Sequence, residues 1–324
     1  MGHVLAINDC GFGDAGKGTM VDAYAGRIGA QAVIRYNGGA QAVHHVVTAD
    51  GRSHGFSQFG SATFHPGVKT HLSRFMLTSP TGLLEEELAL RTLGVTDAFQ
   101  RLTIDRNAPI ITPYHRAANW IRELARGTGE HGTCGMGIAE TMQDLLANQP
   151  DMLFANDLGQ ARTVAVKLRR LRARKRDALE EAITQLPHPF SNRAKLALEL
   201  LASDEAFVAF LRNCQRLADK VRIVDGGHLA TILAQDGGVV FEGAQGVLLD
   251  EWHGFHPYTT WSTTTFANVD TLLDEQGFHG PRCKVGVLRA YATRHGAGPF
   301  VTHDAGLTHS LPEAHNRNDG WQGQ

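Results

Sequence analysis

Short apolar runs alternate along the chain with segments whose apolar residues recur at helical spacing. Residues 3–8 form an apolar run with Val and Ile, which is typical of a buried strand. A glycine-rich segment follows at residues 11–18, residues 19–28 have helical periodicity, and residues 31–36 form a second strand candidate that ends in a turn signature. Strand, loop, helix and strand in this order make a βαβ unit, which predicts parallel pairing with a right-handed crossover.

The same alternation continues along the chain. Further helices are expected at residues 85–92 and 116–126, and extended segments at residues 102–104, 108–111, 221–224, 238–242 and 283–288. Residues 157–223 differ, because helical patterns follow one another there, at residues 164–184, 193–202 and 205–222. The pattern predicts an α/β fold in which helices cover both faces of a mostly parallel central sheet. We expect one domain over residues 1–324, with residues 157–223 as a helical insertion or cap.

Composition changes this picture mainly through glycine. The 36 glycines among 324 residues are about 11%, against roughly 7% in ordinary proteins. A disordered chain is excluded, because 42% of the residues are hydrophobic and 31 basic residues nearly balance 33 acidic ones, for a net charge of −2. A collagen-like chain is excluded as well, because the glycines have no three-residue period. The glycine excess therefore points to loops.

We expect neither a membrane span nor a signal peptide. No stretch approaches the ~20 uninterrupted apolar residues that cross a bilayer, and the first apolar run ends at Asn8 and Asp9. The four cysteines lie far apart without a CxxC pair, which indicates neither a disulfide framework nor a zinc site. The cytoplasm is the expected location. The histidines are scattered, so we interpret pairs such as His44 and His45 as loop or surface histidines and not as metal ligands.

Residues 167–176 carry seven basic residues in ten. In isolation this run would fit a nucleic-acid interface. The whole chain is slightly acidic, however, and Glu180 and Glu181 follow in the next turns. We therefore interpret the run as a solvated helix face and expect no nucleic-acid partner.

The glycine-rich segment at residues 11–18 has the spacing of a phosphate-binding loop. Between a strand and a helix, such a loop points successive backbone N–H groups at one spot. Lys17 would reach the terminal phosphates of a bound nucleotide. Gly18 stands where this type of loop has a Ser or Thr that binds Mg²⁺, so Asp14 is the candidate metal ligand or base.

Residues 37–45 are a second candidate, because they follow the second expected strand. The carboxyl ends of strands in open α/β sheets carry the ligand site. His44 is a candidate proton donor near neutral pH, with a structural histidine as the alternative.

Several segments together resemble the adenylosuccinate synthetase family. The sequence GDAGKG at residues 13–18 resembles the family's GDEGKG loop, and GGAQAVH at residues 38–44 resembles its GG-x-N-A-G-H segment. Four more matches follow in the same order, at residues 132–138 (GTCGMGI), 241–250 (FEGAQGVLLD), 253–260 (HGFHPYTT) and 286–300 (GVLRAYATRHGAGPF). Chance does not readily produce six colinear motifs.

The resemblance implies a Mg²⁺-dependent ligase of purine nucleotide synthesis. The family phosphorylates the O6 atom of inosine monophosphate with GTP, and the amino group of aspartate then displaces the phosphate. A purine nucleoside monophosphate, a nucleoside triphosphate (GTP or ATP) and aspartate are therefore the expected small-molecule partners, with Mg²⁺ as the metal.

The matching positions also imply roles for single residues. Asp14 would take the N1 proton and help to hold Mg²⁺, and His44 would protonate groups around the transferring phosphoryl. Lys17 would neutralise phosphate charge, Gln245 would touch the purine, and the backbone carbonyl of Val43 would be a second metal ligand. Nucleotide and phosphate contacts are expected at Gly13, Gly16, Gly18, Thr19, Asn37, Gln41, Thr133, Cys134 and Thr260.

This chain departs from the family's motifs at four pocket positions. Ala15 replaces a Glu, Gln41 an Asn, Val43 a Gly, and Cys134 the second Thr of GTTG. Residues 146–153 carry no arginine to match the one that the family sends into its dimer partner's site. The resemblance therefore leaves open a homodimer without a shared site.

The end of the chain departs further. After residues 296–300 the family continues to a VTGR-x-R loop that holds aspartate and ribose, whereas here residues 311–324 contain a single arginine, Arg317. We expect the family's C-terminal region to be missing or shortened. The expectation that this chain uses aspartate and GTP therefore has no support from matching binding residues.

Three functions remain as hypotheses. The first is adenylosuccinate formation. The second is a homologue with changed substrates, such as dGMP for 2-aminoadenine synthesis, ATP, or another amine. The third is a nucleotide-binding protein without turnover, against which the joint presence of Asp14, Lys17, His44 and Gln245 argues.

Overall fold

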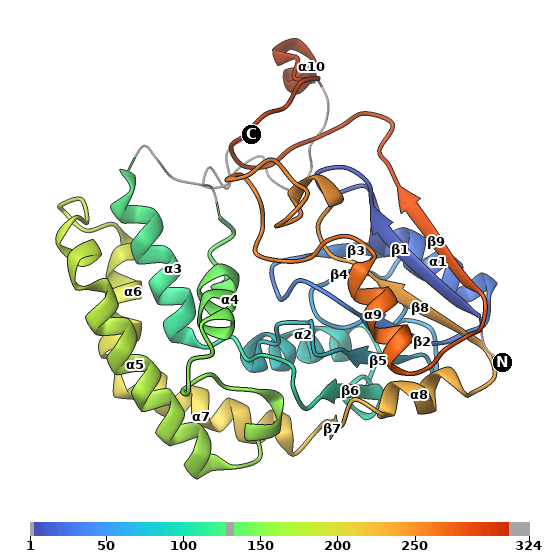
Figure 1. The fold of residues 1–324 in the computed structure, drawn as a ribbon, viewed down its shortest axis with the longest axis horizontal. Helices are drawn as coiled ribbons and strands as arrows, with labels where there is room; N and C mark the ends of the chain where they lie inside the picture. The colour runs from blue at the N-terminus through green and yellow to red at the C-terminus, as the bar shows by residue number, and fades with distance from the viewer. Residues whose placement is uncertain (1–2, 128–132, 311–324) are drawn as a thin grey trace.

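The computed structural model describes residues 3–127 and 133–310 (Figure 1). Its main sheet has seven strands in the order β7-β6-β5-β2-β8-β1-β9, and all of its pairs are parallel. The strands are β1 (Val4–Asp9), β2 (Ala30–Arg35), β5 (Lys69–Leu72), β6 (Leu102–Asp105), β7 (Arg222–Val224), β8 (Gly238–Glu242) and β9 (Arg282–Val287). A separate antiparallel hairpin pairs β3 (His44–Val47) with β4 (Ser53–Phe56).

Helices cover both faces of the sheet centre because the strand residues that point to either face are apolar. On one face, Val4 and Ala6 of β1 pack with α8 (His228–Leu233) and α9 (Ala267–Glu275). On the other face, Leu5 and Ile7 pack with α1 (Lys17–Arg27). Strands that are buried on both faces read as continuous apolar runs. The predicted α/β fold with a mostly parallel sheet is confirmed.

The remaining large helices form a lobe beside the β7 edge (Figure 1). They are α2 (Pro80–Thr92), α3 (Pro113–Ala125), α4 (Ile138–Leu146), α5 (Ala161–Thr184), α6 (Asn192–Ala202) and α7 (Asp204–Ala218). The expected insertion at residues 157–223 contains α5, α6 and α7. These helices share one apolar core with α2, α3 and the strand β6. The lobe is therefore packed as a continuation of the sheet's core.

Several boundaries differ from the predictions for local reasons. The helix expected at residues 85–92 begins at Pro80, because the Ser79 hydroxyl accepts the N–H of Gly82 at 3.2 Å and caps the helix. Residues 108–111 form isolated bridges and no regular strand. The helix expected to reach residue 222 ends at Ala218.

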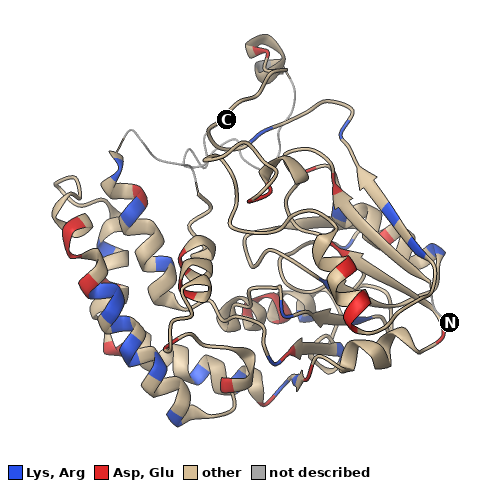
Figure 2. Cartoon of the chain, in the orientation of Figure 1, with Lys and Arg blue, Asp and Glu red and all other residues tan. Residues whose placement is uncertain are grey.

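Figure 2 shows the basic run as a series of Lys and Arg positions along α5, and several of them form ion pairs within the lobe. Lys175 is 3% exposed and lies 2.7 Å from Glu140 and 3.1 Å from Asp144. Arg174 binds both Asp144 and Asp151. The interpretation as a solvated face is therefore wrong for Lys175, because the acidic partners come from segments far away in the sequence.

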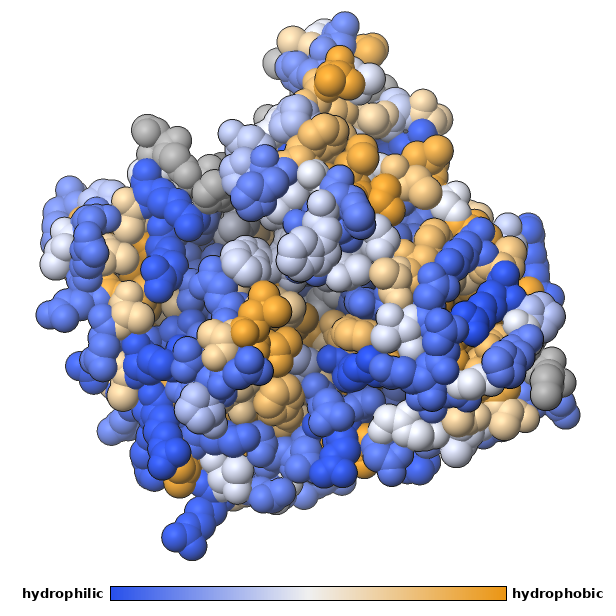
Figure 3. Space-filling model, in the orientation of Figure 1, coloured by the Kyte–Doolittle hydropathy of each residue, from blue (hydrophilic) through white to orange (hydrophobic). Residues whose placement is uncertain are grey.

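The helix α10 (Ala305–Ser310) lies apart from the main sheet with its covering helices and from the helical lobe. Residues 301–308 are all exposed, and apolar side chains gather at the top of the view there (Figure 3). Val301, for example, is 97% exposed. This segment adds no buried side chain to the core. Separately, none of the helices in the described ranges combines the length and apolarity that a membrane crossing needs.

The buried His71 on β5 is expected to make the stability of the fold depend on pH. Its side chain is buried, its Nδ1 lies 2.9 Å from the Thr103 hydroxyl, and burial together with the nearby His228 lowers its pKa to about 3. Below pH 6.5 the unfolded chain takes up a proton that the folded chain refuses. Stability should therefore fall as the pH drops from about 6.5 to about 3, by up to about 1.4 kcal/mol per pH unit from this group. Urea unfolding at several pH values measures the slope. His71→Asn should flatten it, whereas an equal slope in the exposed-site control His279→Asn and in His71→Asn would contradict the assignment.

Candidate active site

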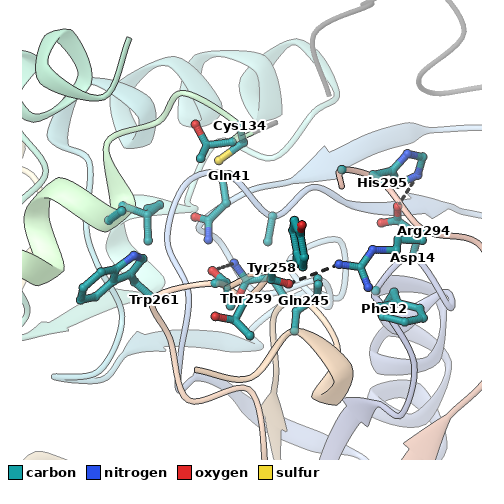
Figure 4. Close-up of a pocket in the computed structure, with 18 of the residues that line it drawn as sticks. Phe12, Asp14, Gln41, Cys134, Gln245, Tyr258, Thr259, Trp261, Arg294 and His295 are labelled. Carbon is teal, nitrogen blue, oxygen red and sulfur yellow. Dashed lines mark hydrogen bonds and ion pairs between the residues drawn. The ribbon is translucent and has the colours of Figure 1, made fainter. Parts of the chain in front are cut away.

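The candidate site lies where β1, β2 and β8 end together. Ile7 of β1 and Arg35 of β2 are both in register with Glu242, the last residue of β8. Beyond these ends a cavity of about 270 Å³ opens between the glycine-rich loop and the segments near residues 41–44, 133–139, 257–261 and 294–297 (Figure 4). This is the end of a parallel sheet at which ligands bind in open α/β folds.

Most of the predicted site residues line this cavity. They are Gly13, Asp14, Lys17, Gln41, Val43, His44, Thr133, Cys134, Gln245 and Thr260. They come from five separate segments, so the sequence motifs converge in space.

Four of the predicted residues do not line the cavity. The Asn37 amide is buried and holds the backbone of Ala244 and the carbonyl of Thr263. Gly18 lets α1 approach β3, since a Cβ there would lie 2.9 Å from backbone atoms of His44 and His45. Thr19 is exposed, and Gly16 precedes α1 in the left-handed conformation that glycine favours. Asn37, Gly16 and Gly18 therefore support the backbone around the cavity without lining it, and Thr19 lies at the surface.

Three backbone N–H groups of the glycine-rich loop converge on the carboxylate of Asp9. This buried side chain accepts the N–H of Gly11 at 2.8 Å, of Ala15 at 2.9 Å and of Gly13 at 3.3 Å. The ammonium of Lys17 lies 3.3 Å from the same carboxylate. These three N–H groups and Lys17 therefore have an internal anion as a partner, and the expected contacts of the loop with a bound phosphate stay a prediction.

Burial lowers the pKa of Lys17, while the Asp9 and Asp14 carboxylates raise it. We predict that Asp9→Asn destabilises the protein by about 3 kcal/mol, because it removes the carboxylate that pairs directly with the buried Lys17. Urea unfolding measures this cost. Lys17→Gln in the same chain should recover part of it, because the two changes act on one pair. A change within about 0.5 kcal/mol, as at ordinary surface sites, would contradict the role of Asp9.

Asp14 stands at the tip of the loop with its side chain 55% exposed and its φ at 60°, in the left-handed region. Its carboxylate lies 3.0 Å from Nε2 of His295. The hydrogen bond from His295 lowers the pKa of Asp14; burial opposes the shift, and the charges of His295, Lys17 and Arg289 reinforce it. Asp14 is therefore an ionised carboxylate that a ligand in the cavity can reach.

His44 and Glu242 form a buried pair at the floor of the cavity. Nδ1 of His44 bonds a Glu242 carboxylate oxygen, and the backbone N–H of Ser61 donates to the other oxygen at 2.9 Å. Burial opposes the ionisation of Glu242, but the Arg35 charge and the bonds from His44 and Ser61 lower its pKa to about 2. Burial lowers the pKa of His44 to about 4, although Glu242 acts in the opposite direction. His44 is thus neutral near pH 7, with its Nδ1–H donated to Glu242.

Polar atoms without partners face the cavity. Nε2 of His44, Oε1 of Gln245 and both amide atoms of Gln41 are buried and make no hydrogen bond within residues 3–127 and 133–310. Buried polar atoms in native proteins are normally paired. These atoms are therefore available to pair with a molecule bound in the cavity.

One wall of the cavity is held together by Arg294. Its guanidinium donates to the carbonyls of Ala297 at 2.6 Å, Pro299 at 3.0 Å and Tyr258 at 3.3 Å. It also lies 4.5 Å from the ring centroid of Phe12 (Figure 4). Arg294 thus joins the loop after β9 to the segment near residue 258 and to the glycine-rich loop.

Comparison with known proteins identifies the family. A model of the adenylosuccinate synthetase family matches residues 7–317 of this chain. The chain belongs to the adenylosuccinate synthetase family. The adenylosuccinate synthetase of Psychromonas ingrahamii is 36% identical over 310 residues, which are 93% of this chain and 64% of that protein. That of Haemophilus influenzae is 32% identical over 309 residues, with 93% and 65% covered. The chain thus spans about two thirds of the length of these curated relatives.

Solved structures share the fold. The fully ligated adenylosuccinate synthetase from Plasmodium falciparum superposes with a TM-score of 0.73 at 23% identity and covers 92% of this chain and 64% of its own. The succinoaminodeoxyadenylate synthetase of cyanophage S-2L, which is bound to dGMP and to dATP as an energy donor, has a TM-score of 0.58 at 21% identity, with 89% and 64% covered. At these identities the likeness concerns the fold.

Three residues of this adenylosuccinate synthetase family member were missed by sequence reasoning. Asp9 and Glu242 are carboxylates that end apolar strands, a signal that could have marked them as buried groups at the ligand edge. His295 follows a matched motif position, and nothing in its local sequence indicates a contact with Asp14. Arg317 lies outside the described residues.

Proposed function

We propose that this chain carries the nucleotide-activating centre of a Mg²⁺-dependent ligase of the adenylosuccinate synthetase type. It would phosphorylate O6 of a 6-oxopurine nucleoside monophosphate with a nucleoside triphosphate, and the amino group of aspartate would then displace the phosphate. Inosine monophosphate and GTP are the substrates that family membership favours. The observation that carries the proposal is the convergence of Asp14, Lys17, His44 and Gln245 on one cavity.

Asp14 supplies the base of the first step. Its low pKa keeps the carboxylate ionised, and its exposure lets the N1–H of a purine approach. Removing the N1 proton moves electron density onto O6, which makes that oxygen the nucleophile toward the terminal phosphate.

His44 acts on the transferring phosphoryl group. It is neutral before the ligand binds, with Nε2 open toward the cavity. Negative phosphoryl oxygens beside Nε2 favour the imidazolium, so the pKa of His44 rises when the substrate binds. Glu242 keeps the ring oriented and balances the added charge. Lys17, held by Asp9, contributes a fixed positive charge at the base of the loop.

The residues present fit a Mg²⁺ ion that is bound together with substrate phosphates. The described residues contain no cluster of three His, Cys, Asp or Glu side chains that could hold a metal by themselves. Mg²⁺ commonly takes one or two carboxylates and completes its shell with phosphate oxygens and water. Asp14 and the backbone carbonyl of Val43 would hold it, and the ion would neutralise phosphate charge during transfer.

A panel of substrates tests this function. The protein is incubated with Mg²⁺, GTP or ATP, inosine monophosphate or dGMP, and aspartate, while phosphate release and the mass of the nucleotide product are followed. Adenylosuccinate, or its 2-amino deoxy counterpart from dGMP, would support the ligase. No product with any combination would contradict it and favour a nucleotide-binding protein without turnover.

A further inference from the structure

The helix α4 is held in the lobe by charged side chains more than by apolar ones. Its buried residues are Ile138, Glu140, Thr141 and Asp144, so one of the four is apolar. Apolar contacts have no preferred direction and tolerate a small shift of a helix, whereas hydrogen-bonded ion pairs hold only at a fixed geometry. The place of α4 is therefore set by the partners of its two buried carboxylates.

Lys175 of α5 joins these two carboxylates. Its side chain is buried, and its ammonium lies 2.7 Å from Glu140 and 3.1 Å from Asp144. The two acids are four positions apart, so they stand one turn apart on one face of α4. A single cation bonded to both fixes the helix along its axis and in rotation, because either movement lengthens at least one of the two bonds.

Other cationic and polar groups surround the same two carboxylates. Arg174 donates to both oxygens of Asp144 at 2.9 Å, and Nε2 of His115 on α3 lies 3.0 Å from one of them. Arg122 of α3 lies 2.8 Å from Glu140. Both acids thus keep a partner when the α5 ammonium is removed. Buried ion pairs add little net stability compared with apolar packing, so what this ammonium contributes is a defined geometry.

The first turn of α4 is part of the cavity wall. Ile138 and Ala139 line the cavity, and so do Thr133 and Cys134 just before the helix (Figure 4). Ile138 also packs on the segment that follows β2, since its Cδ1 lies 2.6 Å from the place that a Cβ of Gly39 would take. A displacement of α4 therefore moves the wall and disturbs the segment opposite.

We propose that Lys175 is a positioning residue of the candidate active site, which holds the first turn of α4, and with it the cavity wall at residues 133–139, in its binding-competent place. Lys175 itself does not line the cavity. Its effect on turnover rests on the proposed function, whereas its effect on the wall does not.

Thiol alkylation measures the position of the wall without turnover. Cys134 is a partly buried residue of the wall, and burial raises the pKa of its thiol, so its reaction with iodoacetamide is slow. Cys214 is buried in α7 within the lobe core, and Cys283 on β9 is exposed. Peptide mass spectrometry after alkylation of the native protein gives the rate of each thiol, with Cys283 as the internal standard.

In Lys175→Met we expect the Cys134 rate to rise by about 10-fold or more, because α4 is free to shift and the thiol becomes accessible. The Cys214 rate should stay unchanged. A wild-type Cys134 rate would overturn the proposal. A parallel rise at Cys214 would overturn it as well, because it would indicate a general loosening of the lobe.

Lys167→Met is the matched control. Lys167 lies on the same helix, 2.8 Å from Asp157 and 3.1 Å from the carbonyl of Met152. The same substitution there removes an ion pair of the lobe that does not involve α4, so the Cys134 rate should stay at its wild-type value. An equal rise in the control would remove the assignment to the α4 contact.

A double variant keeps the test decisive if the single change prevents folding. Glu140→Gln together with Lys175→Met removes one charge of each sign, and Asp144 keeps Arg174 as its partner. The link between α4 and the α5 ammonium is equally lost, so the Cys134 rate should again rise by about 10-fold or more. A wild-type rate in this variant would contradict the proposal.

Turnover connects the wall to the proposed function. With both variants shown to be folded by urea unfolding, kcat/KM for the nucleoside monophosphate should fall by about 10-fold or more in Lys175→Met and stay within about 2-fold in Lys167→Met. An unchanged kcat/KM with a faster Cys134 reaction would overturn the positioning role. If the wild-type protein forms no product, the proposed function fails, and the alkylation rates still decide whether Lys175 holds the wall.

Discussion

Asp14→Asn is expected to lower turnover by about 10² to 10⁴-fold while the fold stays intact. The amide has nearly the same shape as the carboxylate, but it cannot accept the N1 proton of a purine. The side chain is 55% exposed, so its replacement creates no cavity and no buried unpaired charge. Phosphate release under saturating substrates measures the change in turnover, and urea unfolding measures stability.

The matched control is Asp50→Asn. Asp50 lies in the turn between β3 and β4, outside the cavity, and its side chain is 59% exposed. This variant should keep wild-type turnover. Turnover of Asp14→Asn within a few-fold of wild type would exclude Asp14 as the base.

His44→Asn is expected to lower turnover by a similar factor, about 10² to 10⁴-fold, because the imidazole next to the transferring phosphoryl is lost. Glu242→Gln should also lower it, since an amide cannot balance the imidazolium charge. The neighbouring His45 is exposed and its Nε2 lies 3.0 Å from the Ser53 hydroxyl, outside the cavity, so His45→Asn is the control. Single-turnover phosphate transfer separates this chemistry from product release.

His44→Asn should also change the dependence of stability on pH. The pKa of His44 is about 4 in the folded chain and near 6.5 when unfolded, so this group costs stability as the pH falls from 6.5 to 4. The variant should be less acid-sensitive over this window. An unchanged turnover would exclude His44 from the phosphoryl step, and an unchanged pH slope would contradict its burial as a neutral ring.

The fold was predictable where strands are buried on both faces. β1, β2 and β8 read as apolar runs, because both faces are covered by helices. β5, with the sequence KTHL, was missed because three of its four residues are polar. The buried side chain of its His71 has a hydrogen-bonding partner, the Thr103 hydroxyl, that lies on a different strand. A buried polar residue with a hydrogen-bonding partner does not add to the apolar pattern from which a strand is predicted.

The sequence predicted which residues line the candidate site better than it predicted the contacts between those residues. The motifs placed Asp14, Lys17, His44 and Gln245 in one cavity, as strand order at a sheet edge implies. The pairing of His44 with Glu242 depends on the strand order of the main sheet, which places β2 beside β8. That order joins residues more than 190 positions apart, which no local pattern encodes.

The position of β1 also sets when the site can form. β1 is the second element from one edge of the main sheet, and both of its partners come late in the chain: Val4 pairs with Val239 and with Arg282. During synthesis the strand that carries Asp9 and the glycine-rich loop emerges first, yet it has no strand to pair with until most of the chain has left the ribosome. Contacts of such long range close slowly. β1 therefore waits for β8 and β9 during much of synthesis, and the cavity at its carboxyl end takes shape only after these late strands are available.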